Sequence, residues 1–136
     1  MKDCLFCKII QGEIKSWKVY EDESVYAFLD INPVNEYHTL VIPKNHYENL
    51  FDIPEDELVK VILVVQKLAL LYKDHLEINN VQVINSSGKE AQQDIFHVHF
   101  HIIPREKNDG QNINWKTHPE WQEKFDPLLM EIKGIE

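Results

Sequence analysis

The sequence predicts an α+β fold, with an antiparallel meander sheet of about five strands, one long helix and a short amino-terminal helix. Three observations predict it. Short runs rich in β-branched and aromatic residues recur between turn signals. One apolar segment, residues 55–75, is long enough for a helix of about six turns. The chain has 136 residues, 43% of them apolar, which suits one domain with its own core. We therefore expect a single domain over residues 1–136, with a carboxy-terminal tail from about residue 105.

Each expected strand is bounded by residues that favour turns or stop a strand. The acidic stretch Asp22-Glu23-Ser24 separates the first two strands, and Asn32-Pro33 ends the second. Pro43 stops the third strand and Pro104 closes the fifth. The five strands are expected at residues 17–21, 25–31, 39–42, 81–85 and 95–103. The two shorter helices are expected over residues 5–11 and near residues 120–132.

The long helix is apolar over most of its circumference. Pro54 suits its first turn, and the three acidic residues 55–57 complement the positive end of the helix dipole. Clear polar positions recur only at Lys60, Lys67 and Asp74, seven residues apart. A helix with so narrow a polar stripe is covered on more than one side. We expect a second subunit to cover it in a two-fold homodimer; the alternative is a helix sunk deep in its own core.

The charge balance excludes some partners. With 23 acidic and 14 basic residues the net charge is −9, which argues against a protein that neutralises nucleic-acid phosphates. The amino terminus has too short an apolar run for a signal peptide, and no segment is apolar enough to span a bilayer. We therefore expect a cytoplasmic protein with no nucleic-acid or membrane partner. Thiols stay reduced there, so Cys4 and Cys7 are metal ligands or free thiols rather than a disulfide.

Residues 97–103, HVHFHII, hold the strongest signal. Side chains alternate across a strand, so His97, His99 and His101 share one face, while Val98 and Phe100 lie on the apolar one. A neutral imidazole can attack phosphorus, and its neighbours can stabilise charge or donate protons. A metal cluster is the competing interpretation, because His-x-His pairs are common zinc ligands.

The pattern His-φ-His-φ-His-φ-φ, with φ apolar, resembles the signature of the histidine-triad (HIT) family. Residues 25–33 (VYAFLDINP) and 38–46 (HTLVIPKNH) resemble that family's nucleoside-binding and second histidine segments. The C-x-x-C start resembles its zinc-bearing bacterial members, and the branch that the chain most resembles is the Hint-like one. The resemblance covers most of the chain and implies a HIT-like fold.

The resemblance implies that His99 is the nucleophile. It would attack the α-phosphorus of a purine nucleotide and form a nucleotidyl-histidine, which water then hydrolyses. The backbone carbonyl of His97 would fix the tautomer of His99. His101 would contact the phosphate, and His38 would complete the polar site. Each role needs a group preorganised at the phosphorus.

The resemblance also implies a set of nucleotide contacts. Asp30 would accept hydrogen bonds from ribose hydroxyls, unless it is simply a surface residue that ends a strand. Phe28 and Ile31 would help to line the base slot, although both also suit ordinary core packing. Asn85 and Gln93 occupy positions that resemble the family's polar phosphate site.

The chain departs from the family pattern just before the triad. Many relatives have Ala-Gly-Gln followed by a small or hydroxyl residue, whereas this chain has Ala91-Gln92-Gln93-Asp94. An ionised carboxylate can only accept hydrogen bonds and repels phosphate. Asp94 therefore points away from the site, is protonated, or slows turnover.

The metal prediction follows from the resemblance to zinc-bearing relatives. Cys4 and Cys7 can place two thiolates on one ion, and His46 and His97 would complete a tetrahedral site. Such a zinc ion would have a structural role and would join the amino terminus to the sheet.

The function expected is that of a purine nucleotide-binding hydrolase, which cleaves the P–N bond of nucleoside phosphoramidates or a related bond at the α-phosphorus. Three alternatives stay open: a dinucleoside polyphosphate hydrolase of the Fhit-like branch, a nucleotide-binding scaffold with residual activity, and a zinc hydrolase whose triad binds metal. Trp115, in the tail, either stacks on a base or packs at the dimer interface.

Overall fold

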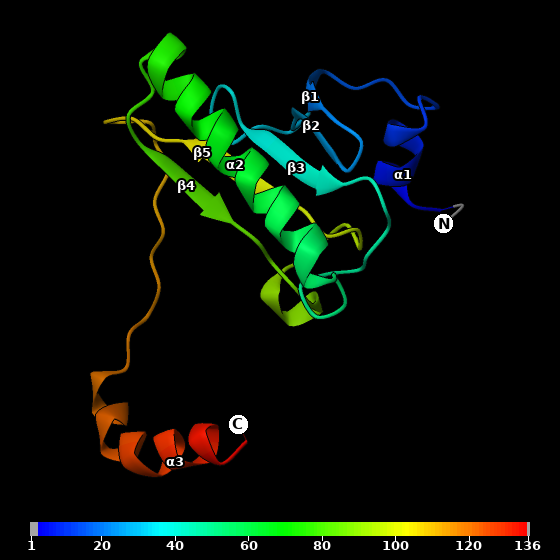
Figure 1. Cartoon of the computed structure of the whole chain (residues 1–136). Coiled ribbons are helices and arrows are strands. Elements are labelled where there is room, and N and C mark those ends of the chain that lie inside the picture. The colour runs from blue at the N-terminus through cyan, green and yellow to red at the C-terminus, as the bar shows by residue number, and fades with distance from the viewer. Residues whose placement is uncertain (1–2, 136) are drawn as a thin grey trace.

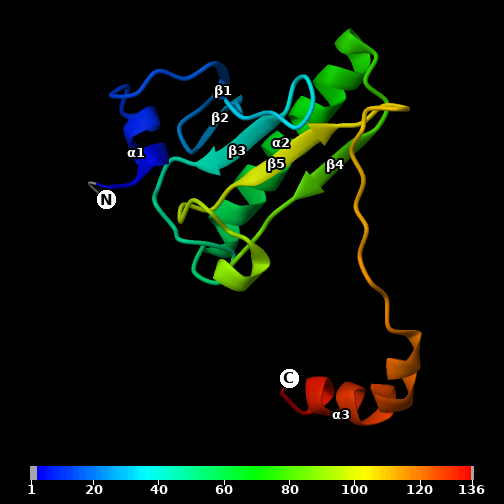
Figure 2. The same ribbon diagram turned by 180° about the vertical axis from the view of Figure 1, so that it is seen from behind.

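The computed structural model describes residues 3–135 and has the expected α+β architecture. Its single sheet has five strands in the order β1-β2-β3-β5-β4, and all neighbouring strands are antiparallel. One long helix, α2, crosses one face of the sheet, and α1 lies on the other side (Figures 1 and 2). In chain order the elements are α1 (Leu5–Ile10), β1 (Lys18–Glu21), β2 (Val25–Leu29), β3 (Thr39–Pro43), α2 (Glu55–Leu76), β4 (Val81–Ile84), the 3-10 helix η1 (Lys89–Ala91), β5 (Phe100–Pro104), the 3-10 helix η2 (Pro119–Lys124) and α3 (Phe125–Ile135).

The strand order departs from a simple meander after β3. The first three strands follow one another across the sheet, as expected. The chain then crosses the sheet through α2, whose 22 residues span about 33 Å. It continues into β4 at the sheet edge, and β5 returns into the space between β3 and β4. The strand that carries the end of the histidine motif is therefore an inner strand with a partner on each side.

The two faces of the sheet bury two apolar clusters, which the alternation along each strand separates. On β3, Val41 packs under α2, whereas Leu40 and Ile42 pack toward α1. The cluster under α2 contains Val25, Ala27, Val41, Ile53, Val61, Val64, Val65, Leu68, Val98, Phe100 and Ile102. The cluster toward α1 contains Phe6, Ile9, Tyr26, Phe28, Leu40 and Ile42. Val98, Phe100 and Ile102 thus occupy the apolar face that the sequence predicted.

The last strand is shorter than predicted. Residues 95–99 do not join the sheet, and β5 begins at Phe100. To extend β5 backwards, the next hydrogen bond from β3 would have to be donated by the backbone N–H of Pro43. Proline has no such group. The carbonyl of Pro43 is also taken, because Nε2 of His97 donates to it at 2.8 Å. The main chain of this segment is held instead by a bond from the Val98 N–H to the carbonyl of Tyr47, at 2.8 Å.

A polar clamp fixes the point at which the chain leaves the sheet. The Arg105 guanidinium bonds the Asp109 carboxylate at 2.8 and 3.1 Å, the side chain of Gln82 and, at 2.6 Å, the carbonyl of Gln111. Asn35 donates to the same carboxylate at 2.9 Å. Beyond this clamp the chain runs away from the sheet into η2 and α3, which match the helix expected near residues 120–132 (Figures 1 and 2).

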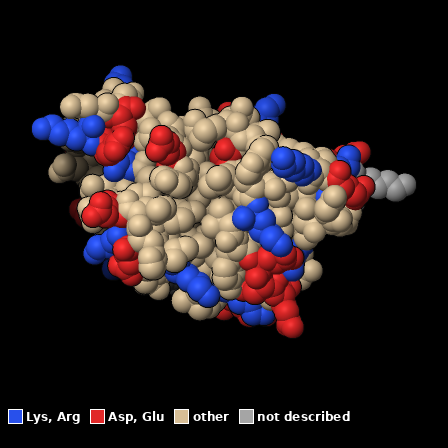
Figure 3. All heavy atoms as spheres, turned by 90° about the horizontal axis from the view of Figure 1, so that it is seen from above, with Lys and Arg blue, Asp and Glu red and all other residues tan. Residues whose placement is uncertain are grey.

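The surface carries both signs of charge. On the face shown in Figure 3, lysine and arginine side chains stand among acidic ones and are separated by uncharged surface. Within residues 3–135, no helix combines the length and the apolar composition that a membrane span requires.

Candidate active site and metal centre

A cavity of about 170 Å³ opens between α1, β2 and the histidine segment. Its walls come from five stretches of chain: α1, residues 14–16, the end of β2 with the turn after it, Leu40 on β3, and residues 94–101. Six of the residues predicted from the sequence line it: Phe28, Asp30, Ile31, Asp94, His99 and His101. Four more residues predicted for the catalytic and nucleotide-binding site do not line the cavity. They contact the residues of its wall, or the chain segment that carries those residues, and are His38, His97, Asn85 and Gln93.

The hydrogen bonds of His99 fix its tautomer. Its side chain is 4% exposed, and Nδ1 donates to the carbonyl of His97 at 2.8 Å. A neutral imidazole with its proton on Nδ1 has a free lone pair on Nε2. Nε2 lies 3.8 Å from Oδ1 of Asp94, whose side chain is 81% exposed. The carbonyl of His99 accepts a bond from Nδ2 of Asn85 at 3.0 Å, so the backbone of His99 is held as well as its ring.

A second chain of hydrogen bonds sets the tautomers of His38 and His101. The N–H of Val34 donates to Nδ1 of His38 at 3.0 Å, so the proton of His38 is on Nε2. That nitrogen lies 2.9 Å from Nδ1 of His101 and donates to it, which leaves the proton of His101 on Nε2. Burial lowers the pKa of both rings, and the pKa of His101 falls to about 4. Both are therefore neutral at pH 7.

Asp30 lies at the end of β2, in the wall of the cavity. Its Oδ1 accepts the N–H of Asn32 at 2.8 Å, and its Oδ2 lies 3.5 Å from Nε2 of His38. This leaves lone pairs of the carboxylate for other donors, because an ionised carboxylate can accept about four hydrogen bonds.

Asn85 and Gln93 make bonds to the main chain and do not line the cavity. The amide nitrogen of Gln93 donates to the carbonyls of Glu48 and Ile95 at 2.7 and 3.0 Å, and its oxygen accepts the N–H of Gly88 at 2.8 Å. A phosphate contact by Gln93 would require one of these bonds to be exchanged. Both residues thus hold the segment that leads into the histidines.

Next to the cavity, two thiols and two imidazoles converge. Nδ1 of His97 lies 3.4 Å from Sγ of Cys4, 3.5 Å from Sγ of Cys7 and 3.2 Å from Nδ1 of His46. Sγ of Cys7 lies 3.4 Å from Nδ1 of His46, and all four atoms are within 4.8 Å of one another. Tetrahedral zinc, with bonds of about 2.3 Å to sulfur and 2.0–2.1 Å to nitrogen, separates its ligand atoms by about 3.3–3.8 Å. The observed distances between the four ligand atoms fit such a site.

The protonation of the four groups also suits a cation. Nε2 of His97 donates to Pro43, so its Nδ1 lone pair points at the thiols, and burial lowers its pKa to about 4. Burial and the neighbouring Cys4 raise the pKa of Cys7 to about 11. A bound metal ion supplies the positive charge that converts such thiols to thiolates.

The comparisons with known proteins agree with this geometry. Residues 11–108 match the family model described as "HIT domain". The chain belongs to the HIT domain family. A crystal structure of a HIT family protein from Bacillus anthracis has a TM-score of 0.90 and 38% identity, with 98% of this chain and 97% of that one covered.

Two further HIT proteins bear on function. An adenosine 5'-monophosphoramidase of Candida albicans is 39% identical over an alignment of 137 positions. The alignment covers 96% of this chain and 89% of that protein. A zinc-bound histidine triad family protein from Mycobacterium smegmatis has a TM-score of 0.77 and 31% identity, and 99% of each chain is covered. The HIT family thus includes nucleotide hydrolases and zinc-bound members.

A second group of possible metal ligands in this HIT domain is better explained as hydrogen-bonded. Asp30, His38 and His101 have ligand atoms within 4.8 Å of one another. The N···N separation of His38 and His101 is 2.9 Å, which suits an N–H···N bond and is shorter than the roughly 3.3 Å between two nitrogens on tetrahedral zinc. Nδ1 of His38 is already an acceptor for a backbone N–H.

Sequence reasoning missed the part of the cavity that α1 builds. Leu5, Phe6 and Ile9 line the cavity beside Phe28. The position of Phe6, between two predicted metal ligands, was the available signal. Sequence reasoning also missed the buried Glu57, because its two neighbours in the first turn of α2 are exposed acids of the same kind.

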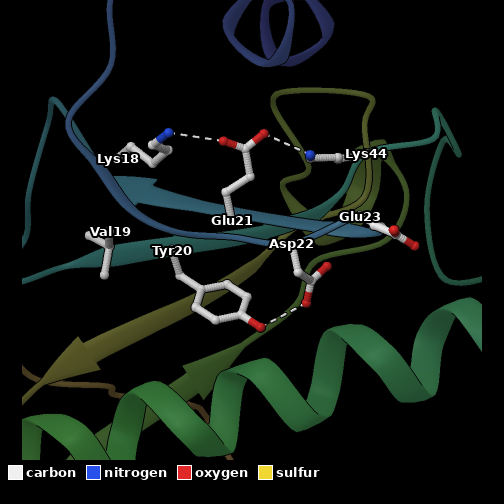
Figure 4. A pocket seen from close by; sticks show the side chains of 7 residues that line it. All are labelled: Lys18, Val19, Tyr20, Glu21, Asp22, Glu23 and Lys44. Carbon is white, nitrogen blue, oxygen red and sulfur yellow. Dashed lines mark hydrogen bonds and ion pairs between the residues drawn. The ribbon is translucent and has the colours of Figure 1, made fainter.

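Figure 4 shows a separate, open depression on the β1–β2 hairpin, of about 580 Å³. Glu21 forms ion pairs with Lys18 at 2.9 Å and with Lys44 at 2.6 Å. Tyr20 donates to Asp22 at 2.8 Å. The triad histidines do not line it, and Glu21 and Asp22 already pair with the groups that Figure 4 joins to them by dashed lines.

Proposed function

We propose that this HIT protein hydrolyses nucleoside phosphoramidates at the α-phosphorus through a nucleotidyl-His99 intermediate. The observation that carries the proposal is the bond from Nδ1 of His99 to the carbonyl of His97, which aims the lone pair of Nε2 at the cavity. The name of the relative in Candida albicans supports an adenosine 5'-monophosphoramidate as the substrate class.

The proposed reaction has two displacements at phosphorus. Nε2 of His99 attacks, the N–P bond to His99 forms, and the P–N bond to the leaving amine breaks. The amine keeps the electron pair and takes a proton from water at the mouth of the cavity. A water molecule then attacks the phosphorus and loses a proton, and the bond to His99 breaks with its electron pair returning to Nε2. The products are the free amine and the nucleoside monophosphate.

The surrounding groups have separate parts in this proposal. His101 is neutral and carries its proton on Nε2, so it donates to a phosphate oxygen without adding a positive charge. His38 holds it in that tautomer. Asp30 accepts from the ribose hydroxyls, and the purine lies against Phe28 and Ile31.

Asp94 favours this substrate class over dinucleoside polyphosphates. Its carboxylate lies 3.8 Å from the attacking nitrogen, where each additional phosphate charge of a substrate is repelled. The leaving amine of a phosphoramidate adds no such charge.

We also propose that Cys4, Cys7, His46 and His97 hold a structural zinc ion. Their mutual distances support it, as does the zinc-bound relative in Mycobacterium smegmatis. A bound zinc ion cross-links the amino terminus to the sheet.

The proposed homodimer rests on the outer face of α2. Val59, Leu63 and Leu70 are more than half exposed there, although the same helix buries its other face on the sheet. The arm beyond residue 110 also exposes apolar side chains, including Trp115. Leu63→Glu is expected to convert the dimer to a monomer in analytical ultracentrifugation, and Lys60→Glu, on the polar stripe of the same helix, is not. A monomeric parent protein would contradict the dimer.

Trapping tests the nucleophile. The protein is mixed with an adenosine phosphoramidate and quenched in base, and mass spectrometry locates the nucleotide on the chain. We expect adenylate on His99. His99→Gly should bind AMP but lose turnover by at least about a thousandfold, whereas His75→Ala, at an exposed position outside the cavity, keeps both.

The outcomes separate the proposal from its rivals. Turnover of His99→Gly at the parent rate would refute the nucleophile. A higher rate on dinucleoside polyphosphates than on phosphoramidates would favour the Fhit-like activity. Binding of AMP without turnover of either class would leave a nucleotide-binding scaffold, and loss of turnover on chelation without loss of AMP binding would favour a zinc hydrolase.

A further inference from the structure

We propose that the metal centre controls the affinity for the base of the nucleotide, because α1 joins the two sites. The inference rests on the proposed function, since it concerns the same cavity. It gives the cysteine-histidine centre a part in substrate recognition that does not depend on any contact between metal and substrate.

The short helix α1, with Cys4 as its N-cap, carries residues of both sites. Cys4 begins the helix, and its Sγ accepts the N–H of Cys7 at 3.3 Å, so the two thiols and the helix start form one unit. Leu5, Phe6 and Ile9 line the cavity from the same helix. A shift of the thiols therefore moves this cavity wall.

Phe6 is the closest link between the sites. Its ring lies edge-on to three others, with centroids 5.9 Å from His97, 5.2 Å from His99 and 5.4 Å from Phe28. It thus touches a metal ligand, the proposed nucleophile and the proposed base slot. Edge-on aromatic contacts at such distances contribute favourably to packing and constrain ring orientation.

Little besides the metal centre and apolar packing holds α1 in place. In the part of the chain that the structure describes, the backbone bonds recorded for residues 4–13 run among those residues, and α1 pairs with no strand. Phe6 and Ile9 are its buried apolar anchors in the cluster toward α1. A helix of six residues is far too short to be stable by itself. A metal ion that joins Cys4 and Cys7 to His46 and His97 therefore fixes the helix.

The phosphate side of the cavity keeps supports that involve neither α1 nor the metal, because Nε2 of His97 bonds the carbonyl of Pro43 and Asn85 bonds the carbonyl of His99. His99 is oriented by the carbonyl of His97 and by Asn85, and His101 by His38. Loss of the metal should therefore loosen the wall beside the base and leave the phosphate-binding groups in place. Zinc should therefore change the affinity for ligands that contain a base and should not change the affinity for a ligand that lacks one.

Calorimetry tests this with the complete protein. AMP is titrated into zinc-loaded protein and into protein stripped by a chelator, with circular dichroism to verify that the stripped protein is folded. The Kd for AMP should weaken about tenfold on removal of zinc. The Kd for ribose 5-phosphate, which has no base, should change by less than about twofold on the same treatment.

Coupling between two sites is reciprocal, which gives a second measurement on zinc-loaded protein. Saturating AMP should tighten zinc binding by the same factor, measured by competition with a chromophoric chelator. Ribose 5-phosphate should leave zinc binding unchanged in the same experiment, and equal tightening by both ligands would mean that zinc acts through folding of the whole chain and would overturn the inference. Phe6→Ala should still bind zinc but lose the coupling. Lys8→Ala, on the same helix but outside the cavity lining, should keep it.

The inference would be overturned if the affinity for AMP were the same with and without zinc and the affinity for zinc were the same with and without AMP. A loss of ribose 5-phosphate binding equal to that of AMP would also overturn it, because the whole cavity would then depend on the metal. Failure of the zinc-loaded protein to bind AMP would instead overturn the proposed function.

Discussion

Oδ1 of Asp94 lies 3.8 Å from Nε2 of His99, the nitrogen proposed to attack phosphorus. Of the alternatives that the sequence left open for Asp94, the structure disfavours the one in which the side chain points away. Its carboxylate faces the position where an anionic phosphate must arrive, yet it is largely exposed and therefore well screened. The first prediction follows from this relationship.

Asp94→Asn should raise kcat/KM for an adenosine phosphoramidate about fivefold, the order expected for removing one charge about 4 Å from another in water. The gain should be larger for a dinucleoside polyphosphate and should shrink at high salt. Asp126→Asn, in the exposed arm, is the charge-matched control. An unchanged or reduced rate would mean that Asp94 assists the reaction.

Asn85 is expected to be a positioning residue for His99. Its Nδ2 donates to the His99 carbonyl at 3.0 Å, and its oxygen accepts from Ser87 at 2.8 Å. Asn85→Ala should lower kcat about tenfold, because the nucleophile is no longer held in place, and should leave the KM for substrate nearly unchanged. Steady-state kinetics measure the split. Ser87→Ala, which removes the donor to Asn85 and the acceptor of the Leu50 N–H, should have a smaller effect on kcat. A change confined to KM in Asn85→Ala would indicate direct substrate contact by Asn85.

Glu57 should stabilise the segment that carries the metal ligand His46. Asn45 and Tyr47, on either side of that ligand, donate to the same oxygen of Glu57 at 2.8 and 3.2 Å. Glu57→Ala leaves these donors without their acceptor and should lower the free energy of unfolding by about 2 kcal/mol, measured by urea denaturation. Zinc affinity should fall with it.

Two matched variants make this test specific. Glu57→Gln keeps an acceptor oxygen and should recover most of the loss. Glu55→Ala removes an exposed carboxylate from the same turn of α2 and should have little effect. Equal stability of Glu57→Ala and Glu55→Ala would contradict the proposed support of the His46 segment.

Acidification should destabilise the fold through His101. Burial lowers its pKa in the folded chain to about 4, against about 6.5 when unfolded. Between these two pH values the unfolded chain binds more protons at His101 than the folded chain does. The stability that His101 contributes is therefore complete above about pH 6.5 and is lost as the pH falls toward 4. His101→Gln should therefore show a shallower loss of stability over this range.

The measurement is the urea midpoint of both proteins from pH 7 to 4.5. All other residues are the same in both proteins, so the difference between their slopes reports the replacement of His101. His75→Gln, at an exposed position, should follow the parent slope. Parallel slopes for His101→Gln and the parent would refute the assignment.

The sequence predicted the elements that depend on local pattern. The helix expected over residues 55–75 is α2, residues 55–76, because its periodicity and acidic first turn are local signals. The alternation of Val98 and Phe100 with the histidines placed the apolar face correctly. The start of β5 was wrong by several residues, because it depends on the missing N–H of Pro43, which lies on another strand.

The candidate site was predictable where a residue type has a distinctive chemistry. The two cysteines, His46 and His97 do converge, and the predicted Asp30 does line the cavity. The cavity-lining role of Phe6 was not predictable, because its position between two cysteines places it beside the metal ligands but does not show that a cavity lies there. The actual contacts of Gln93 depend on Glu48 and Gly88, which the sequence alone does not bring together.

His97 contributes to the two centres through different parts of the same residue: its ring faces the thiols, and its main chain orients His99. Every amino acid has a carbonyl, so the orientation of the nucleophile places no demand on which side chain stands at position 97. In the proposed zinc site, the need for a ligand side chain there comes from the ion. A cysteine at that position would still offer a ligand while the reacting ring kept its partner, so the first histidine of the triad is exchangeable in a way that the second is not.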